Sequence, residues 1–177
     1  MKEFENKRII LTGASSGIGH SLLKYFINEG AIVYATSRNK RELTKEDEQK
    51  CNFELLDLAN ENNVKKYVKG IMENENSIDI LINNAILQPQ DRNIWEVDEL
   101  FWDKVMNLSL KAYFFGAKRA AKHMISQGNG GKIISLASVH AYAAMPDWPI
   151  YGVAKSGIIR MAKGLSVDLR GTVIKLN

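Results

Sequence analysis

Cysteine and histidine are scarce in this chain, and their scarcity excludes two kinds of site. Cys51 is the single cysteine among 177 residues, so the chain has neither an internal disulfide nor a cysteine-based zinc site. The three histidines, His20, His123 and His140, are scattered and do not show the spacing of metal ligands. We therefore expect no metal site, and the single thiol fits a reducing compartment.

Long apolar runs and a strong charge of one sign are also missing. No segment approaches the length of a membrane span, and residues 1–8 contain no apolar core of signal-peptide length. The 24 Lys and Arg residues exceed the 20 Asp and Glu residues by only four, and they are dispersed along the chain. A nucleic acid or a membrane surface is therefore a poor candidate partner, and we expect a cytoplasmic protein.

Short apolar runs alternate with helical patterns along the whole chain. Strands are expected at residues 8–12, 31–36, 51–56, 78–82, 132–137 and 172–176. Helices are expected from Ile18 to Gly30, from Asn60 to Ile71, from Glu99 to Met124 and from Ile150 to Leu169, with a charged, helix-like segment at 40–50. This alternation predicts an α/β fold in which a Rossmann-like, doubly wound parallel sheet forms a three-layer α/β/α domain over residues 1–177.

A glycine-rich turn joins the first expected strand to the first expected helix. Its sequence is Thr12-Gly13-Ala14-Ser15-Ser16-Gly17-Ile18-Gly19, which has the spacing G-x-x-x-G-x-G. Glycine lets the backbone approach a pyrophosphate, and the free amides of a helix N-terminus attract phosphate. In this strand-turn-helix setting the motif indicates a dinucleotide site, whereas the glycines alone could form a tight turn without a ligand.

The end of the second strand indicates which dinucleotide is bound. An acidic residue there would accept hydrogen bonds from a ribose 2′-hydroxyl, but the strand runs instead into Ser37-Arg38. A guanidinium can pair with a 2′-phosphate. We therefore favour NADP(H) over NAD(H), the alternative being that Arg38 lies in a solvated loop.

Two further expected strands are followed by polar residues that should lie at the same ligand-binding edge of the sheet. Asp57 and Leu58 follow the third strand, where Asp57 either accepts a hydrogen bond from an adenine amine or is a plain loop carboxylate. Asn84 and Ala85 follow the fourth strand and should lie where ligands bind in open α/β sheets. The asparagine is also expected to satisfy backbone groups between strands.

Tyr151 and Lys155 are four residues apart on an expected helix, and Tyr151 follows Ser138 by thirteen residues. Side chains at this spacing lie on one helix face, so the ammonium can favour the phenolate form of the tyrosine and make it an acid-base catalyst. Ser138 would hold the reacting oxygen. The pair alone could be an ordinary surface pair.

Asn107 interrupts an apolar helix and either bridges backbone groups or joins a polar network near the crevice.

Together these motifs resemble those of the short-chain dehydrogenase/reductase family along nearly the whole chain. The resemblance implies that Tyr151 exchanges a proton with the substrate oxygen and that Ser138 polarises this oxygen. It also implies that Lys155 holds the nicotinamide ribose and that Asn107 supports a water linked to Lys155. The implied cofactor residues are Gly13, Ser15, Ser16, Gly17, Ile18, Gly19, Ser37, Arg38, Asp57, Leu58, Asn84, Ala85, Tyr151 and Lys155.

The resemblance implies an enzyme that transfers a hydride between NADP(H) and a carbonyl or secondary alcohol, acting on the CH–OH group. A 3-oxoacyl-thioester reductase and a sugar or polyol dehydrogenase both fit. The alternatives are an NADP(H)-binding sensor or scaffold without turnover, or an inactive truncated fragment. The family's packing also implies a homodimer or homotetramer formed through the long helix around Asn107 and the helix after Tyr151.

The chain departs from the family pattern at two points. Ile86 stands where the family usually has glycine, which would either narrow the cofactor pocket or shift the cofactor slightly. The family normally continues past a segment like 173–177 with a Pro-Gly turn, a substrate-covering loop and a last strand. We therefore expect the 177 residues to lack that last strand and the substrate lid.

Overall fold

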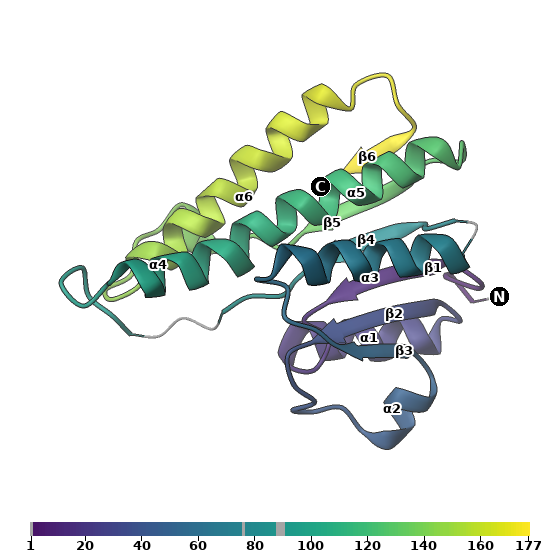
Figure 1. The fold of residues 1–177 in the computed structure, drawn as a ribbon, viewed down its shortest axis with the longest axis horizontal. Helices are drawn as coiled ribbons and strands as arrows, with labels where there is room; N and C mark the ends of the chain where they lie inside the picture. Colours follow the sequence, from purple (N-terminus) through teal and green to yellow (C-terminus); the bar gives the residue numbers. More distant parts are fainter. Residues whose placement is uncertain (1, 76, 88–90) are drawn as a thin grey trace.

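The apolar runs of the sequence form the strands of one parallel sheet (Figure 1). The structure, a computed structural model, describes residues 2–75, 77–87 and 91–177. The strands are β1 (Arg8–Thr12), β2 (Ile32–Ser37), β3 (Asn52–Leu55), β4 (Ile80–Asn83), β5 (Gly131–Ser135) and β6 (Ile174–Leu176). They are ordered β3-β2-β1-β4-β5-β6, and every neighbouring pair is parallel. The predicted Rossmann-like sheet is therefore confirmed.

Helices cover both faces of this sheet. They are α1 (Gly17–Asn28), α2 (Lys45–Gln49), α3 (Glu61–Asn74), α4 (Glu99–Met106), α5 (Ala112–Ser126) and α6 (Pro149–Asp168), with a π-helix at Asn107–Lys111 and a 3-10 turn at Val139–Ala141. Helices α3, α5 and α6 lie on one face, and α1 lies on the opposite face (Figure 1). No helix of the described residues is both long and apolar enough to cross a membrane.

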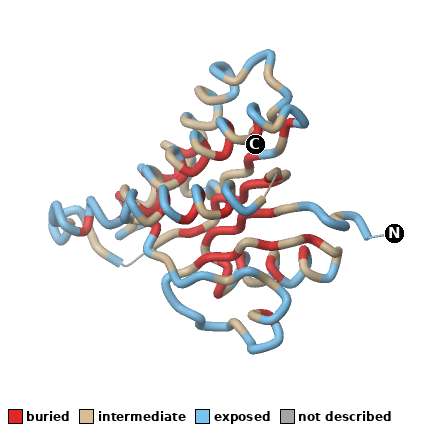
Figure 2. The backbone as a smooth tube through the Cα atoms, turned by 45° about the vertical axis from the view of Figure 1, so that its right-hand side comes forward, coloured by how far each residue is buried: buried red, intermediate tan, exposed pale blue. Residues whose placement is uncertain are grey.

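The core consists of two apolar layers, one on each side of the sheet. Because side chains alternate along a strand, Ile10 of β1 packs in the cluster that contains α3 and α5, whereas Ile9 and Leu11 pack in the cluster that contains α1. Figure 2 shows the buried backbone concentrated in the strands and the inward sides of the helices, with the segment around α2 largely exposed.

The strand order reverses between β1 and β4, and this reversal positions the site. From β1 the chain continues outward through β2 and β3, then returns to place β4 on the other side of β1. In open α/β sheets such a reversal separates the loops at the carboxyl ends of the two central strands and leaves a crevice between them. The glycine turn after β1 and Asn84 after β4 flank this crevice.

Helix starts follow from capping residues in the sequence. The side chain of Asn60 accepts hydrogen bonds from the backbone N–H groups of Asn62 and Asn63, as expected for the cap of α3. Thr44 and Asp47 form a reciprocal capping box at α2. This box sets the start of the helix, and the charged segment 40–50 forms one short helix, Lys45–Gln49, instead of the longer helix-like stretch that its composition indicated.

The single long helix expected from Glu99 to Met124 is interrupted. Residues Asn107–Lys111 form a π-helix between α4 and α5, in which the N–H of Ala112 donates to the carbonyl oxygen of Asn107, five residues earlier. A π-helix inserts one extra residue into a helix. The apolar pattern of the segment continues through it, which is why periodicity predicted one continuous helix.

The side chain of Gln127, at the end of α5, joins this helix to the loop before β4. Its Oε1 accepts from the N–H of the buried Ile78 at 2.9 Å, and its Nε2 donates to the carbonyl oxygens of Ile78 at 3.0 Å and Gly130 at 2.7 Å.

Because Gln127→Ala leaves these backbone groups unpaired, we expect it to lower the free energy of unfolding by about 2–4 kcal/mol in urea titrations. The neighbouring exposed Ser126→Ala should change it by about 0.5 kcal/mol or less, and equal effects of the two variants would contradict this role of Gln127.

Candidate functional site

A cavity of about 550 Å³ lies at the carboxyl ends of β1 to β4. Most of the predicted cofactor residues line it, namely Gly13, Ser15, Ser16, Gly17, Ile18, Gly19, Ser37, Arg38, Leu58, Asn84 and Ala85. Residues that the sequence did not single out for this role also line it, namely Asn39, Arg41, Leu56, Leu87 and Leu108, together with Ile86. The structure thus brings four separate loops around one hollow of a size suited to a small-molecule ligand.

Two glycines of the turn are required by close backbone packing. A Cβ on Gly19 would lie 2.0 Å from the carbonyl oxygen of Gly13, and one on Gly13 would lie 2.8 Å from Cα of Ala85. Gly17 is different, because it has a φ of +53° and a Cβ there would meet nothing within 4 Å. The space beside Gly17 is therefore open, and its backbone is exposed at the start of α1.

Asn84 and Thr12 tie the glycine turn to the end of β4. The Nδ2 of Asn84 donates to the carbonyl oxygens of Thr12 at 2.9 Å and Gly13 at 3.1 Å. The hydroxyl of Thr12 accepts from the N–H groups of Asn84 at 2.9 Å and Ala85 at 3.1 Å. The backbone role expected of Asn84 is thus present in the structure, and it fixes both walls of the cavity relative to each other.

Asp57 lies outside the lining of the cavity. Its Oδ1 accepts from the N–H of Ala59 at 3.0 Å, and its carbonyl oxygen accepts from the Nδ2 of Asn63 at 3.4 Å. Of the two roles that the sequence left open for Asp57, these contacts match the loop carboxylate. Ile86 also lines the cavity.

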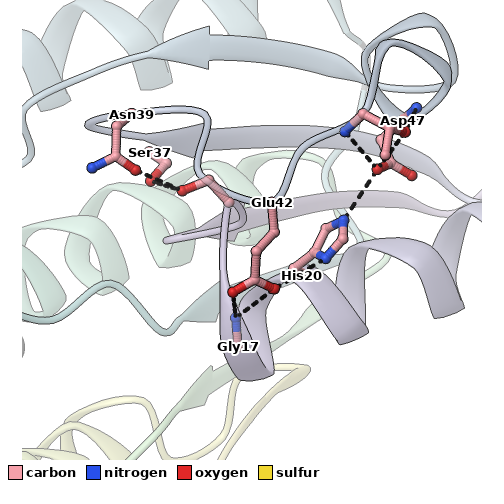
Figure 3. Close-up of polar contacts among 8 residues, drawn as sticks. Gly17, His20, Ser37, Asn39, Glu42 and Asp47 are labelled. Carbon is pink, nitrogen blue, oxygen red and sulfur yellow. Dashed lines mark hydrogen bonds and ion pairs between the residues drawn. The ribbon is translucent and has the colours of Figure 1, made fainter.

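The loop after β2 packs against the glycine turn through polar contacts (Figure 3). The buried hydroxyl of Ser15 lies 2.7 Å from that of Ser37 and donates to Oδ1 of Asn39 at 3.2 Å. Arg38, between these two partners, is exposed and has no hydrogen bond or ion pair to the residues that the structure describes. A cation that lines the cavity without a partner is available to an anionic ligand.

Lys155 is buried next to β5. Lys155 is only 2 % exposed, and its Nζ donates to the carbonyl oxygen of Leu136 at 2.6 Å. The same Nζ lies 5.7 Å from the ring centre of Tyr151 and 5.6 Å from that of Tyr113. Burial disfavours the charged form and lowers the pKa of Lys155 from 10.5 to about 8. The predicted pair of Tyr151 and Lys155 therefore shares one helix face, with the lysine inside and the tyrosine half-buried.

Tyr151 belongs to an aromatic cluster that the sequence did not reveal. Its ring contacts His140 at 5.9 Å and Trp148 at 5.6 Å between centres, and these two rings contact each other at 4.9 Å. The indole N–H of Trp148 donates to Oδ1 of Asp91 at 2.8 Å. His140 is half-buried, with its ring against these two aromatic side chains. A loop of irregular backbone gives no periodic signal for such contacts.

Ser138 and Asn107 each occupy a special backbone position at the start of a short helical segment. Ser138 caps the 3-10 turn, where its Oγ accepts from the N–H of His140 at 3.2 Å, so Ser138 and Tyr151 have His140 as a common neighbour. Asn107 begins the π-helix, and the next residue, Leu108, lines the large cavity. Within the described ranges, no group of three or more His, Cys, Asp or Glu side chains is arranged to hold a metal ion.

Comparisons with known proteins place this chain in a family. The model of the family described as "short chain dehydrogenase" matches residues 7–177. The 3-oxoacyl-[acyl-carrier-protein] reductase FabG of Thermotoga maritima is 32% identical over 98% of this chain and 72% of its own length. The glucose and ribitol dehydrogenase of Daucus carota is 31% identical over 99% of this chain and 64% of its own length.

A solved structure shows the same fold with a ligand named in its description. The 4-hydroxyisoleucine dehydrogenase complexed with NADH superposes with a TM-score of 0.90 at 27% identity, over 97% of this chain and 73% of that protein. The chain therefore spans roughly two thirds to three quarters of these related proteins.

Burial of Lys155 predicts a pH dependence of stability. Between pH 8 and 10.5 the unfolded chain keeps a proton on Lys155 that the folded chain has lost, so the free energy of unfolding rises with pH in this window. One such proton contributes a slope of at most about 1.4 kcal/mol per pH unit. We expect Lys155→Met to flatten the slope measured by urea unfolding at several pH values, whereas exposed Lys163→Met should leave it in place. A slope unchanged by Lys155→Met would show that this amine titrates normally.

Proposed function

Because the chain belongs to the short-chain dehydrogenase family, we propose that it is an oxidoreductase that transfers a hydride between NADP(H) and a carbonyl or secondary alcohol. The reaction would act on the CH–OH group of the alcohol. The observation that carries this proposal is the cavity of about 550 Å³ at the strand-order reversal, lined by the glycine turn and by Asn84 and Ala85.

The residues around the cavity fit a dinucleotide. Open space beside Gly17 leaves room for phosphate at the start of α1, whose first amides have no partner within the helix. The residues proposed to hold the phosphates are Ser16, Gly17 and Ile18, and those proposed to hold the nicotinamide half are Asn84, Ala85, Tyr151 and Lys155. When bound, the nicotinamide ring supplies or accepts the hydride.

The proposed proton transfer uses the tyrosine of the aromatic cluster. During reduction, the Tyr151 hydroxyl would give its proton to the carbonyl oxygen as that oxygen gains negative charge, and during oxidation it would take the proton from the alcohol. Ser138 would hold the same oxygen through its hydroxyl. Lys155 would supply positive charge beside the phenol ring, and Asn107 would support a water that links Lys155 to solvent.

The substrate is proposed to be a small molecule. One of the related proteins is named as a 3-oxoacyl-[acyl-carrier-protein] reductase and another as a glucose and ribitol dehydrogenase, so a 3-oxoacyl thioester and a sugar or polyol remain the two candidates. Neither a nucleic acid nor a membrane is proposed as a partner, and the proposed location is the cytoplasm.

An apolar groove between α5 and α6 supports the proposed homodimer or homotetramer. It has a volume of about 490 Å³ and is lined by the apolar side chains Leu110, Phe114, Phe115, Met161 and Leu165. Phe114 is 39 % exposed, so this groove presents aromatic surface to solvent. Apolar surface of this kind commonly marks contact with another protein chain.

Arg38 is proposed to read the 2′-phosphate. In NADPH and NADH titrations followed by nicotinamide fluorescence, Arg38→Ala should raise the dissociation constant for NADPH about 10- to 100-fold, because a charge-assisted contact is lost. The constant for NADH should change by no more than about twofold. Lys40→Ala, in the same loop but paired with Glu48, is the matched control. Equal losses for both nucleotides would contradict a role of Arg38 in discrimination.

Tyr151 is proposed to be the acid-base residue. Tyr151→Phe should lower turnover at least about 100-fold on a panel of 3-oxoacyl-thioester, sugar and polyol substrates, since proton transfer is lost. NADPH binding should persist, and exposed Tyr142→Phe should retain turnover. If the unmodified chain binds NADPH but turns over none of the panel, the sensor or scaffold alternative is favoured instead.

A further inference from the structure

The loop after β2 places a carboxylate at the start of α1 (Figure 3). Both carboxylate oxygens of Glu42 accept from the N–H of Gly17, each at 3.3 Å. The backbone N–H of Glu42 donates to the carbonyl oxygen of Ser15 at 2.9 Å, so the main chain of this loop is itself fixed to the glycine turn. Glu42 thus reaches Gly17 from a segment 25 residues later in the sequence.

The carboxylate of Asp47 is linked to that of Glu42 through the ring of His20. His20 of α1 lies between the two acids, with Nδ1 3.4 Å from Oε2 of Glu42 and Nε2 3.1 Å from Oδ2 of Asp47. Asp47 is 7 % exposed and accepts from the N–H and the hydroxyl of Thr44. Burial alone would raise the pKa of Asp47, but the hydrogen bonds from His20 and Thr44 outweigh it and lower the pKa to about 2. The position of Glu42 is therefore fixed by a network, as Figure 3 shows.

Glu42 lies at the rim of the proposed nucleotide cavity. Gly17, to which it is bonded, and Arg41, which precedes it, both line that cavity. The N–H of Gly17 is one of the amides at the helix N-terminus that attract phosphate. Here that donor already has an anionic acceptor, and a phosphate oxygen brought to it would come close to a like charge.

We propose that Glu42 competes with the phosphates of the dinucleotide for the amide of Gly17 and opposes NADPH more strongly than NADH. This inference rests on the proposed function, because it assumes that the cavity binds a dinucleotide. NADPH carries an additional phosphate at the ribose, which the loop containing Arg38 and Glu42 would meet. Arg38 and Glu42 then act in opposite directions on the same ligand, and the balance between them determines the preference.

The test uses a charge series at position 42 in the 177-residue chain. We expect Glu42→Gln to lower the dissociation constant for NADPH about 3- to 10-fold and Glu42→Lys to lower it further, with smaller changes for NADH. Glu46→Gln and Glu46→Lys are the matched controls, because Glu46 is an exposed residue of α2 whose carboxylate pairs with Lys50. These controls should change either constant by less than about twofold. Thermal unfolding of each variant without nucleotide verifies that it is folded.

A phosphate-free ligand separates competition from a general change in the cavity. ADP and adenosine are titrated as competitors of NADPH fluorescence. Glu42→Gln should lower the dissociation constant for ADP and leave the constant for adenosine unchanged. An equal gain for adenosine would overturn the competition, as would NADPH affinity that is unchanged or weaker in both folded Glu42 variants.

The outcomes also separate this inference from the proposed function. If the unmodified chain binds NADPH and neither Glu42 variant gains affinity, the inference alone fails. If no variant binds either nucleotide, the nucleotide site of the proposed function fails, and the inference fails with it.

Discussion

The fold depends on one close approach, between the glycine turn after β1 and the end of β4. Gly13 and Gly19 allow it, because any side chain at Gly19 would collide with the backbone of the turn itself. Asn84 and Thr12 then lock the two segments together by hydrogen bonds in both directions. Since β1 and β4 flank the reversal of strand order, the same contacts that join the two halves of the sheet also shape the cavity between them.

A second contact, independent of the first, positions the proposed catalytic residues Tyr151 and Lys155. The ammonium of Lys155 is taken out of water and directed at a backbone carbonyl just after β5, which links α6 to the sheet. A buried lysine with one such partner is costly for stability, and sites of function commonly carry this kind of cost. Tyr151 is held from the other side by His140 and Trp148, so both members of the pair have a restricted position.

Much of this structure could be predicted from the sequence, because the information lies in local patterns. Buried runs gave the strands, Asn60 gave the start of α3, and the glycine spacing gave a turn that does line the cavity. The π-helix could not be predicted, since one inserted residue leaves the apolar series almost unchanged. The contact of Glu42 with Gly17 joins a loop to a turn, and neither segment has a period that reports on the other. Which residues bind a ligand, and which ligand, is still a prediction.

The π-helix at Asn107–Lys111 also sets the angular relation between α4 and α5. Each residue of an α-helix advances by about 100°, and the wider π turn absorbs one additional residue, so a regular α-helix of the same sequence would turn everything after the segment by about that amount. Phe101 and Val105 of α4 can therefore face Ile150 and Ala154 of α6, while Ala117 and Met124 of α5 face the sheet. The π turn, in place of a regular α-helical turn, is therefore what lets this sequence bury the apolar sides of both helices at once.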